Sequence, residues 1–581
     1  MIAAIPVVLM RPNTNWEAVI DKVAGRPEIA AGEEFIRING RNSLSYVFYA
    51  RWFCIPISVL GGWLCWRWAS RLYSRAAGLL ALGLWSFSPN VLAHGPLATA
   101  DMSGTVFGLL ACYLFWRWLN QTTWRYASWA GLALGLGLLG KITNLYLVPY
   151  LACFGAMAIV CSRRKNPVRP RKEVACQVAW ALFVGWMVLH AGYGFQHALL
   201  PVKSFRFTSR FMAGPEATHE TRLTQGGNRF ADSWLGELPS PVPGDYLVGI
   251  DLQMRDFEVF QYSYLRGEWR APGWPWYYLY AALIKVPVGT LLLLGLALAA
   301  TVLRRDRCSS SKDELFVVLP ALIVLTLVSS QTGMNRHFRY VLPAFPFVFI
   351  WLGKTAAITL TDRFLVPLAR LRAKAAATGK GPPTTTTSRI GALACLLLSS
   401  VAVESLSVYP HSLSFFNVLV GPRAAAEHLT DSNIDWGQDF LFLQRWLADH
   451  RTCRPLRVIG SVSYPLESLG IGGGDGSVIS ETTVPEAGAL PPLPGWYAVS
   501  VSRLYQHEGR YARFLRLRPV AMAGYSVYIY HVTAEDAERL RQNAGLTVAP
   551  GSGKIDSRCP SPFSQEQSDG RASPDPSPVR P

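Results

Sequence analysis

Ten apolar segments, each close to the length that crosses a bilayer, constrain this chain of 581 residues more than any other feature. They lie at 52–66, 76–93, 102–119, 126–140, 142–161, 174–193, 276–303, 315–330, 340–360 and 390–408. The run 126–161 would be about 54 Å long as one helix, against about 30 Å for a bilayer core, and Lys141 interrupts it, so we divide it. The pattern predicts a mainly α-helical protein that crosses the membrane many times.

The charge of the chain supports this interpretation. Only 16% of the residues are charged, and the net charge is +18, which in a soluble protein would suggest a nucleic-acid partner. Cytoplasmic loops of membrane proteins are basic, however. Here Lys and Arg gather in every second connection, at 67–75, 117–125, 163–172, 304–312 and 363–389. We therefore place these loops in the cytoplasm and exclude nucleic acid as a partner.

The alternate connections then face outward, and they define the predicted domains. These are an N-terminal loop segment at 1–51, a membrane domain at 52–408 with a long outward loop at 194–275, an extracytoplasmic α/β domain at 409–533, and a disordered tail at 549–581. Segment 380–389 resembles a flexible linker. Residues 1–10 are too few to cross a membrane, so we expect an additional span upstream of Met1; the alternative is that the short N-terminal segment crosses the membrane unaided.

The sequence indicates no resident cofactor. The ten cysteines include no CxxC pair, which argues against a zinc site or a disulfide framework. No phosphate-binding glycine motif for a nucleotide is present either. We expect no cofactor and name no metal ligands, and a requirement for a divalent metal stays open.

Two candidate residues lie in the outward turn at 88–101. Asp101 stands at the mouth of a span, where an acid is costly unless it is hydrated or paired, so it is a functional candidate. Its structural alternative is the N-cap of the following helix. His94 is a weaker candidate for substrate binding, because a single histidine at an interface is more often a hydrogen-bonded structural group.

Several cations lie on the same face, where the insertion rule does not favour them. Arg336, His337 and Arg339 form a dense turn, and Lys141 and Lys285 stand near the ends of other spans. Guanidinium groups bind phosphate in a bidentate manner, which suits an anionic ligand such as a lipid phosphate. The alternatives are binding of membrane lipid headgroups for the cluster and snorkelling for Lys285.

Two further segments have two interpretations each. Asp435 and Gln438, in the run Asp431–Asp439, resemble a polar surface that holds sugars, but Asp431, Ser432 and Asn433 could instead cap a helix that begins near Trp436. The outward loop 194–275 alternates aromatic and acidic residues. It either covers the site and selects the acceptor, or forms an interfacial aromatic belt.

Six segments together resemble a known family. SPNVLAHGPLATAD, GLGLLGKIT, YYLYAALIKVP, NRHFRYVLPAFPF, YPHSLSFFN and DSNIDWGQD are similar to motifs of the bacterial protein-mannosyltransferase-like membrane glycosyltransferases, over most of residues 40–533. The resemblance implies the GT-C fold, a polyprenyl-phosphate sugar donor and a catalytic face on the outer side of the bacterial inner membrane. It leaves the acceptor open among protein, lipid and glycan.

The resemblance also implies roles for individual residues. Asp101 matches the acid of the family's second outward loop and is the candidate catalytic residue, which would position the acceptor or support the acid of the first loop. That first acid and the family's first helix have no match here. Lys141, Lys285, Arg336 and Arg339 are the candidates for binding the leaving phosphate, and direct displacement would invert the anomeric centre. A membrane transporter or lipid flippase and an inactive truncated scaffold are the alternatives.

Overall fold

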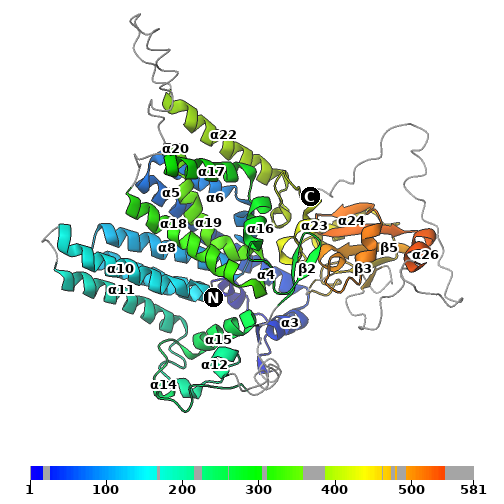
Figure 1. Ribbon diagram of the computed structural model, residues 1–581. Helices are drawn as coiled ribbons and strands as arrows, with labels where there is room; N and C mark the ends of the chain where they lie inside the picture. Colours follow the sequence, from blue (N-terminus) through cyan, green and yellow to red (C-terminus); the bar gives the residue numbers. More distant parts are fainter. Residues whose placement is uncertain are drawn as a thin grey trace, which may run out of the picture.

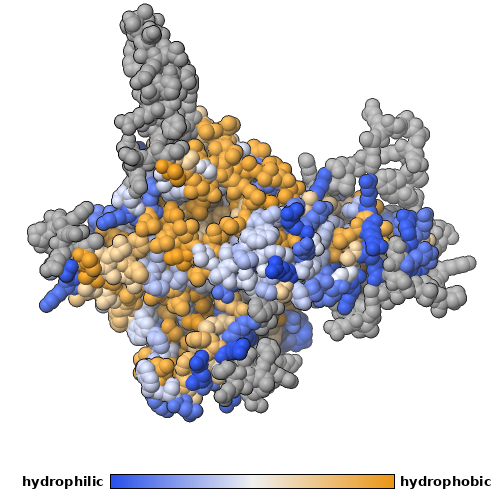
Figure 2. Space-filling model, viewed as in Figure 1, coloured by the Kyte–Doolittle hydropathy of each residue, from blue (hydrophilic) through white to orange (hydrophobic). Residues whose placement is uncertain are grey.

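The computed structural model describes residues 2–17, 27–165, 170–214, 226–258, 261–303, 310–357, 386–460, 462, 464–472, 478–480 and 493–542. A bundle of long helices continues at one end, here called the domain face, into a smaller α/β domain (Figure 1). Hydrophobic residues cover the bundle and hydrophilic residues gather on the α/β domain (Figure 2). The predicted fold class is confirmed. The predicted tail 549–581, and positions 380–385 of the predicted linker, lie outside the described residues.

Each predicted span is helical over most of its length. The bundle contains α5 (Ile55–Leu72), α6 (Arg75–Ser86), α7 (Pro89–His94), α8 (Ala100–Asn120), α9 (Trp124–Gly140), η1 (Ile142–Tyr146), α10 (Leu147–Lys165), α11 (Arg171–Gly192), α16 (Tyr277–Lys285), α17 (Val288–Leu303), α18 (Ser311–Ser330), η3 (Thr332–Met334), η4 (Phe338–Ala344), α19 (Phe345–Leu352), α20 (Lys354–Ala357) and α22 (Thr386–Ser407). By length and composition alone, five helices among the described residues can cross a membrane, or six if α16 and α17 count as one.

Glycines let α9 pack closely against α11. A Cβ atom on Gly131 would lie 2.4 Å from the carbonyl oxygen of Ala181, and one on Gly135 would lie 2.5 Å from Val188. Helices in membranes associate through such small residues, because lipid offers no hydrophobic driving force between them. Helices α8 and α9 also pack closely through glycines at their domain-face ends, and this contact positions the candidate site.

The prediction of one continuous span at 276–303 is wrong. The chain bends by 116° between α16 and α17. Pro287 has no N–H to donate to the carbonyl of Leu283, and Asn417 Nδ2 donates to that oxygen instead, at 2.7 Å, and to Val286 O at 2.9 Å. Beyond the bend, a carboxylate oxygen of Glu404 accepts from Val288 N at 3.0 Å. Hydropathy is continuous across this break, so it did not reveal the bend.

The N-terminal segment is helical rather than a loop. It contains α1 (Ala4–Leu9), α3 (Pro27–Asn39) and α4 (Asn42–Trp52), and α4 leads into α5 with only a short interruption. The side chain of Asn39 binds the backbone of Asn13 to the end of α3, because its Nδ2 donates to Asn13 O at 2.9 Å and its Oδ1 accepts from Asn13 N at 3.1 Å. Sequence alone did not indicate these helices or this contact.

The long loop between α11 and α16 contains short elements around one longer helix. They are η2 (Val202–Ser204), α12 (Arg210–Ala213), α14 (Trp234–Glu237), α15 (Gly244–Glu258) and the hairpin β1 (Ser263–Leu265) and β2 (Glu268–Arg270). The hairpin contacts the α/β domain, because Trp269 Nε1 donates to Tyr505 O at 3.1 Å.

The C-terminal domain has a five-stranded sheet in the order β4-β3-β5-β7-β6. Its elements, with the turns that precede it, are η7 (Ser412–Ser414), α23 (Ala425–His428), η8 (Asp431–Asn433), α24 (Phe440–Asp449), β3 (Leu456–Ile459), β4 (Val478–Ser480), β5 (Gly495–Ser500), α25 (Val501–Leu504), η9 (Ala512–Arg516), β6 (Ala521–Ala523), β7 (Val527–Val532) and α26 (Ala534–Gln542). Asp439 ties the sheet to the turn that follows α22: the carboxylate is buried, accepts from Ser526 N at 2.9 Å and lies 3.1 Å from His411 Nδ1.

Candidate functional site

Asp101 forms an ion-paired centre at the domain face. It lies in the first turn of α8, with Thr99 as the N-cap residue, so the structural alternative, in which Asp101 itself caps this helix, is wrong. Only 5% of Asp101 is exposed. Lys141 Nζ lies 2.6 Å from its Oδ1, and Arg339 Nη1 lies 3.6 Å from its Oδ2. We call Asp101, Lys141 and Arg339 the charge cluster; two cations and one carboxylate give it a formal charge of +1.

Close helix packing brings Lys141 to Asp101. Lys141 follows the last residue of α9 in an extended conformation, before η1 begins. A Cβ atom on Gly104 of α8 would lie only 2.6 Å from Lys141 Cβ, and one on Gly140 would lie 3.1 Å from Gly104 N. The segments ADMSG and LLGK therefore fit together because both carry glycine at the contact.

Aromatic rings surround the two cations of the cluster. The guanidinium of Arg339 lies 4.6 Å from the centre of the Trp436 ring and 5.6 Å from that of Tyr340, and Lys141 Nζ lies 5.5 Å from the Tyr340 ring. Cation–π contacts stabilise a charge without neutralising it. The cluster thus keeps its excess positive charge.

Arg336 and His337 are held by the segment Asp431–Asn433 rather than by the charge cluster. Arg336 Nη2 lies 2.7 Å from Asp431 Oδ2, and its Nη1 donates to Gln261 Oε1 at 2.9 Å. The ring of His337 hydrogen bonds through Nδ1 to Ser432 Oγ. Burial lowers the pKa of His337 to about 4, so the imidazole is neutral near pH 7. The positive charge of this turn therefore comes from its two arginines.

Asn433 connects the same segment to the backbone of the turn. Its Oδ1 accepts from Phe338 N at 2.9 Å, and its Nδ2 donates to Arg336 O at 2.7 Å. The helix after this segment begins only at Phe440, with Asp439 as its N-cap residue, so the alternative in which Asp431, Ser432 and Asn433 cap a helix near Trp436 is wrong. Their polar side chains bind the 336–338 turn instead.

Asp435 and Gln438 shape the turn that presents Trp436. Asp435 is buried, its Oδ1 accepts from Gly437 N at 2.9 Å, and burial raises its pKa. Gln438 Oε1 accepts from Trp436 N at 2.7 Å, and its Nε2 donates to Ile434 O at 2.9 Å. Both side chains thus support the turn from inside, and the residue that they present to the cluster is Trp436.

Lys285 is buried rather than snorkelling, with only 2% of the residue exposed. Its Nζ donates to Leu413 O at 2.9 Å and also to Asn433 O, and it lies 4.7 Å from the centre of the Phe416 ring. This cation joins the end of α16 to the start of the C-terminal region. The structure does not bring it into the charge cluster.

His94 lies next to the charge cluster, close to Trp436 and Arg339. It is buried, its ring meets Trp436 edge to face at 6.2 Å, and its Nδ1 has no hydrogen-bond partner. Together with Lys285, Arg339 and Ser432 it lines a cavity of about 10 Å³, which is room for about one water molecule. His94 therefore neighbours the candidate site without lining its main cavity.

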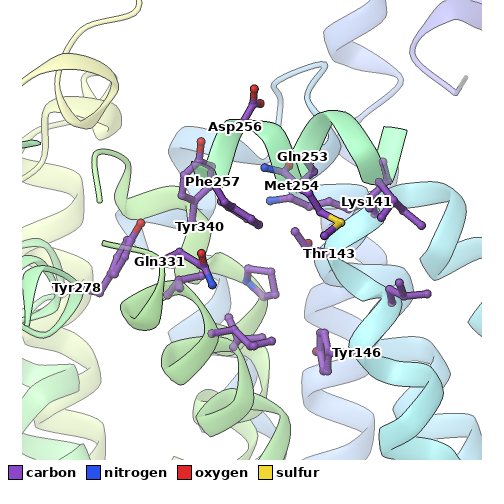
Figure 3. Close-up of a pocket in the computed structure, with 17 residues that line it drawn as sticks. Lys141, Thr143, Tyr146, Gln253, Met254, Asp256, Phe257, Tyr278, Gln331 and Tyr340 are labelled. Atoms are coloured by element: carbon purple, nitrogen blue, oxygen red, sulfur yellow. The ribbon is translucent and has the colours of Figure 1, made fainter. Parts of the chain in front are cut away.

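The main cavity has a volume of about 440 Å³ and begins at Lys141 and Tyr340 (Figure 3). Apolar side chains from η1, α15 and α18 form most of its wall. Gln253, Asp256 and Gln331 supply polar groups. Leu145 and Leu327, which also line it, are exposed on the bundle surface. The cavity thus runs from the outside of the bundle to the charge cluster.

The predicted site residues separate into groups. Asp101, Lys141 and Arg339 meet directly, His94 lies beside them, and Arg336 and His337 face the C-terminal segment.

Sequence reasoning did not identify Tyr340 or the α15 residues Met254 and Phe257 as part of a site. The motif around Arg339 already contained Tyr340, but nothing in the loop 194–275 marked α15 as a wall of the cavity. Among the described residues, no group of three or more His, Cys, Asp or Glu side chains could hold a metal ion.

A family model described as dolichyl-phosphate-mannose-protein mannosyltransferase matches residues 37–188, and so confirms the resemblance over this part of the chain. It includes Asp101 and Lys141 and ends before Arg339. No curated protein matches the sequence.

Solved structures are similar at low identity. ArnT from Cupriavidus metallidurans bound to undecaprenyl phosphate aligns with 11% identity and a TM-score of 0.39, covering 86% of each chain. The archaeal oligosaccharyltransferase AglB from Archaeoglobus fulgidus, in complex with an inhibitory peptide and a dolichol-phosphate, aligns with 13% identity and a TM-score of 0.37. That alignment covers 78% of this chain and 59% of AglB.

Proposed function

We propose that this protein is a membrane glycosyltransferase of the GT-C type, which transfers a sugar from a polyprenyl-phosphate donor to an extracytoplasmic acceptor. The observation that carries the proposal is the apolar cavity of about 440 Å³ that ends at a cluster of net positive charge. An isoprenoid chain with a phosphate at one end has the matching chemistry. The family match over residues 37–188 supports the same activity.

The cavity suits a donor that arrives from the bilayer. Val324, Leu327 and Val328 of α18 line one side of it, and Leu145 lines another. A polyprenyl chain lying along these residues places its phosphate near Lys141 and Arg339. We propose a bacterial inner membrane with the domain face outward, which agrees with the basic loops at the opposite ends of the helices.

In the proposed reaction, an acceptor hydroxyl oxygen forms a bond to the anomeric carbon, and the bond from that carbon to the phosphate oxygen breaks. The electron pair leaves with the phosphate, and displacement in one step inverts the anomeric centre. Lys141 and Arg339 stabilise the negative charge that develops there. The acceptor's proton passes to a base.

We assign Asp101 a positioning role rather than that of the base. Both of its carboxylate oxygens already contact cations, at 2.6 Å and 3.6 Å, and these contacts fix where the two positive charges point. Trp436 supports Arg339 from the other side. The C-terminal segment therefore contributes to the same phosphate site, and the acceptor class stays open among protein, lipid and glycan.

One observation favours a transporter as a second candidate, namely the broken helix formed by α16 and α17, since broken helices form ion and substrate sites in transporters. In those sites the free helix ends bind the cargo. Here Asn417 and Glu404 hydrogen bond to backbone groups on the two sides of the break. This arrangement favours a structural role for the bend, and therefore the glycosyltransferase.

The test uses the whole protein in nanodiscs with undecaprenyl phosphate as the probe. We expect saturable binding that Lys141→Ala and Arg339→Ala weaken about tenfold or more, the loss of one charge-assisted contact. Arg75→Ala, an exposed residue in the first turn of α6, is the matched control. Incubation with labelled undecaprenyl-phosphate hexoses should then release the lipid phosphate. Equal binding by all variants contradicts the phosphate site, and lipid transport without release supports the transporter.

A further inference from the structure

A part of the outward loop carries large apolar side chains on its surface. The segment 195–241, which connects α11 to α15 and is described at 195–214 and 226–241, has a small core around Phe207 and Met212. Outside that core, Trp234 is 73% exposed and Phe211 is 57% exposed. Five further large apolar residues of the segment are also exposed, namely Phe195, Leu199, Leu200, Leu235 and Leu238. We call these seven residues the loop patch.

The segment returns along α11 towards the middle of the bundle. Trp186 Nε1 donates to Pro241 O at 2.6 Å. Trp186 lies six residues before Gly192, the last residue of α11, which is about 9 Å along the helix axis. Figure 1 shows α12 and α14 beside the bundle, not beyond its domain face. If the apolar part of α11 spans the bilayer, the loop patch lies at the depth of the lipid headgroups or below them.

Charged groups near the patch are placed as in an interfacial segment. The guanidinium of Arg229 lies 5.6 Å from the centre of the Phe211 ring and 5.7 Å from that of Phe230. Lys203 and Glu237, both exposed, pair at 2.7 Å. A cation that packs on an aromatic side chain can keep its head among lipid phosphates, while the ring enters the apolar region.

The segment is also fixed to the wall of the main cavity. Asp251 of α15 accepts from Thr208 N at 2.6 Å and Ser209 N at 3.0 Å, and Glu258 accepts from Arg210 N at 2.7 Å. Both carboxylates therefore bind the backbone at the start of α12. The same helix α15 places Met254 and Phe257 in the cavity wall. A displacement of the segment would therefore also displace that wall.

We infer that the loop patch is a membrane anchor whose Trp234 and Phe211 side chains insert into the outer-leaflet interface. The partner is bilayer lipid, and the inference rests on the proposed function only in its use of a membrane-embedded bundle. The anchor holds α15 at a fixed height beside the lipid-facing entrance of the cavity. The entrance of the main cavity therefore stays at a constant depth in the bilayer, where the donor lipid enters it.

The test places a fluorescent dansyl amino acid at position 234 in the whole protein, in nanodiscs with and without brominated lipid. The matched control carries the same amino acid at Glu268, an exposed residue of the β1–β2 hairpin, which contacts the α/β domain. We expect brominated lipid to quench the label at 234 at least twofold more than the label at 268, and aqueous iodide to show the reverse order.

Equal quenching at the two positions by both agents overturns the anchor. Protection of position 234 from both quenchers indicates a protein contact and also overturns it. The measurement needs neither donor nor turnover, so its result is independent of the glycosyltransferase assay. Phe211 gives a second position for the label, which keeps the test decisive if substitution at Trp234 prevents folding.

Discussion

At the scale of single residues, the charge cluster depends on one small side chain. A Cβ atom at position 104 would lie 2.6 Å from Lys141 Cβ. At that distance either α8 or the backbone around Lys141 must shift. Asp101 is one turn away on the same helix. The sequence indicated that Asp101 and Lys141 share a face of the membrane, but their contact depends on a glycine whose role only the packing reveals.

We expect Gly104→Ala to separate α8 from Lys141 and to lower the stability by about 1–3 kcal/mol, the usual cost of overpacking a filled contact. Binding of undecaprenyl phosphate should weaken with it. Gly295→Ala is the control, because a Cβ atom on Gly295 meets nothing within 4 Å. Thermal unfolding in detergent and ligand binding measure the two effects. A Gly104→Ala protein that is indistinguishable from Gly295→Ala would show that the contact is not needed.

Asp101→Asn distinguishes a positioning role from that of a base. The substitution raises the formal charge of the cluster from +1 to +2, so we expect tighter binding of undecaprenyl phosphate together with slower transfer. A base role predicts the same gain in affinity, because the change in charge is the same, but a loss of transfer of about 10²–10⁴-fold. Asp245→Asn, at an exposed acid of α15, should change neither quantity. Equilibrium binding and single-turnover transfer provide the comparison.

At the scale of elements, the helices followed from hydropathy and the bend between α16 and α17 did not. Hydropathy and length predicted where the helices of the bundle lie, because burial in lipid requires long apolar runs. The bend depends on Asn417 and Glu404, more than 100 residues further along the chain, which bind backbone groups at the break. Such contacts between distant residues leave no local pattern in a single sequence. No sequence motif indicated that α15 lies beside the cavity either.

Asn417 should contribute strongly to this bend. In Asn417→Leu, the carbonyl groups of Leu283 and Val286 lose their donors, and each buried unpaired acceptor costs about 1–3 kcal/mol. We expect a fall in thermal stability of several degrees or failure to fold. Ser407→Ala, which removes an exposed hydroxyl bonded within α22, is the control. Stability close to that of the control would mean that Pro287 alone maintains the bend.

At the scale of the whole molecule, the C-terminal region is part of the candidate site and not an appended domain. Sequence patterns predicted an α/β domain there, and the sheet β4-β3-β5-β7-β6 agrees. They did not predict that Asp431, Ser432 and Asn433 reach back to the 336–338 turn. Helix capping was one of the two alternatives for these residues, the other being a surface that holds sugars. The segment DSNIDWGQD thus connects the two parts of the fold.

The contacts between the segment Asp431–Asn433 and the 336–338 turn should contribute very different amounts to stability. The Arg336–Asp431 pair is 32% and 36% exposed, so a double-mutant cycle should give a coupling of less than about 1 kcal/mol. Asn433→Ala removes buried hydrogen bonds to Phe338 N and Arg336 O, and we expect it to cost about 2–4 kcal/mol. Chemical or thermal unfolding in detergent measures both. A larger effect from the exposed pair would contradict this ranking.

The excess charge of the cluster has a kinetic consequence. A polyprenyl-phosphate sugar is a phosphodiester with one negative charge, whereas the lipid monophosphate left after transfer carries about −1.5 to −2 at pH 7. The charge cluster, with its formal charge of +1, attracts the spent carrier more strongly than the fresh donor. Turnover in the proposed reaction should therefore be limited by departure of the used lipid, and added undecaprenyl phosphate should be a competitive inhibitor that binds more tightly than the donor itself.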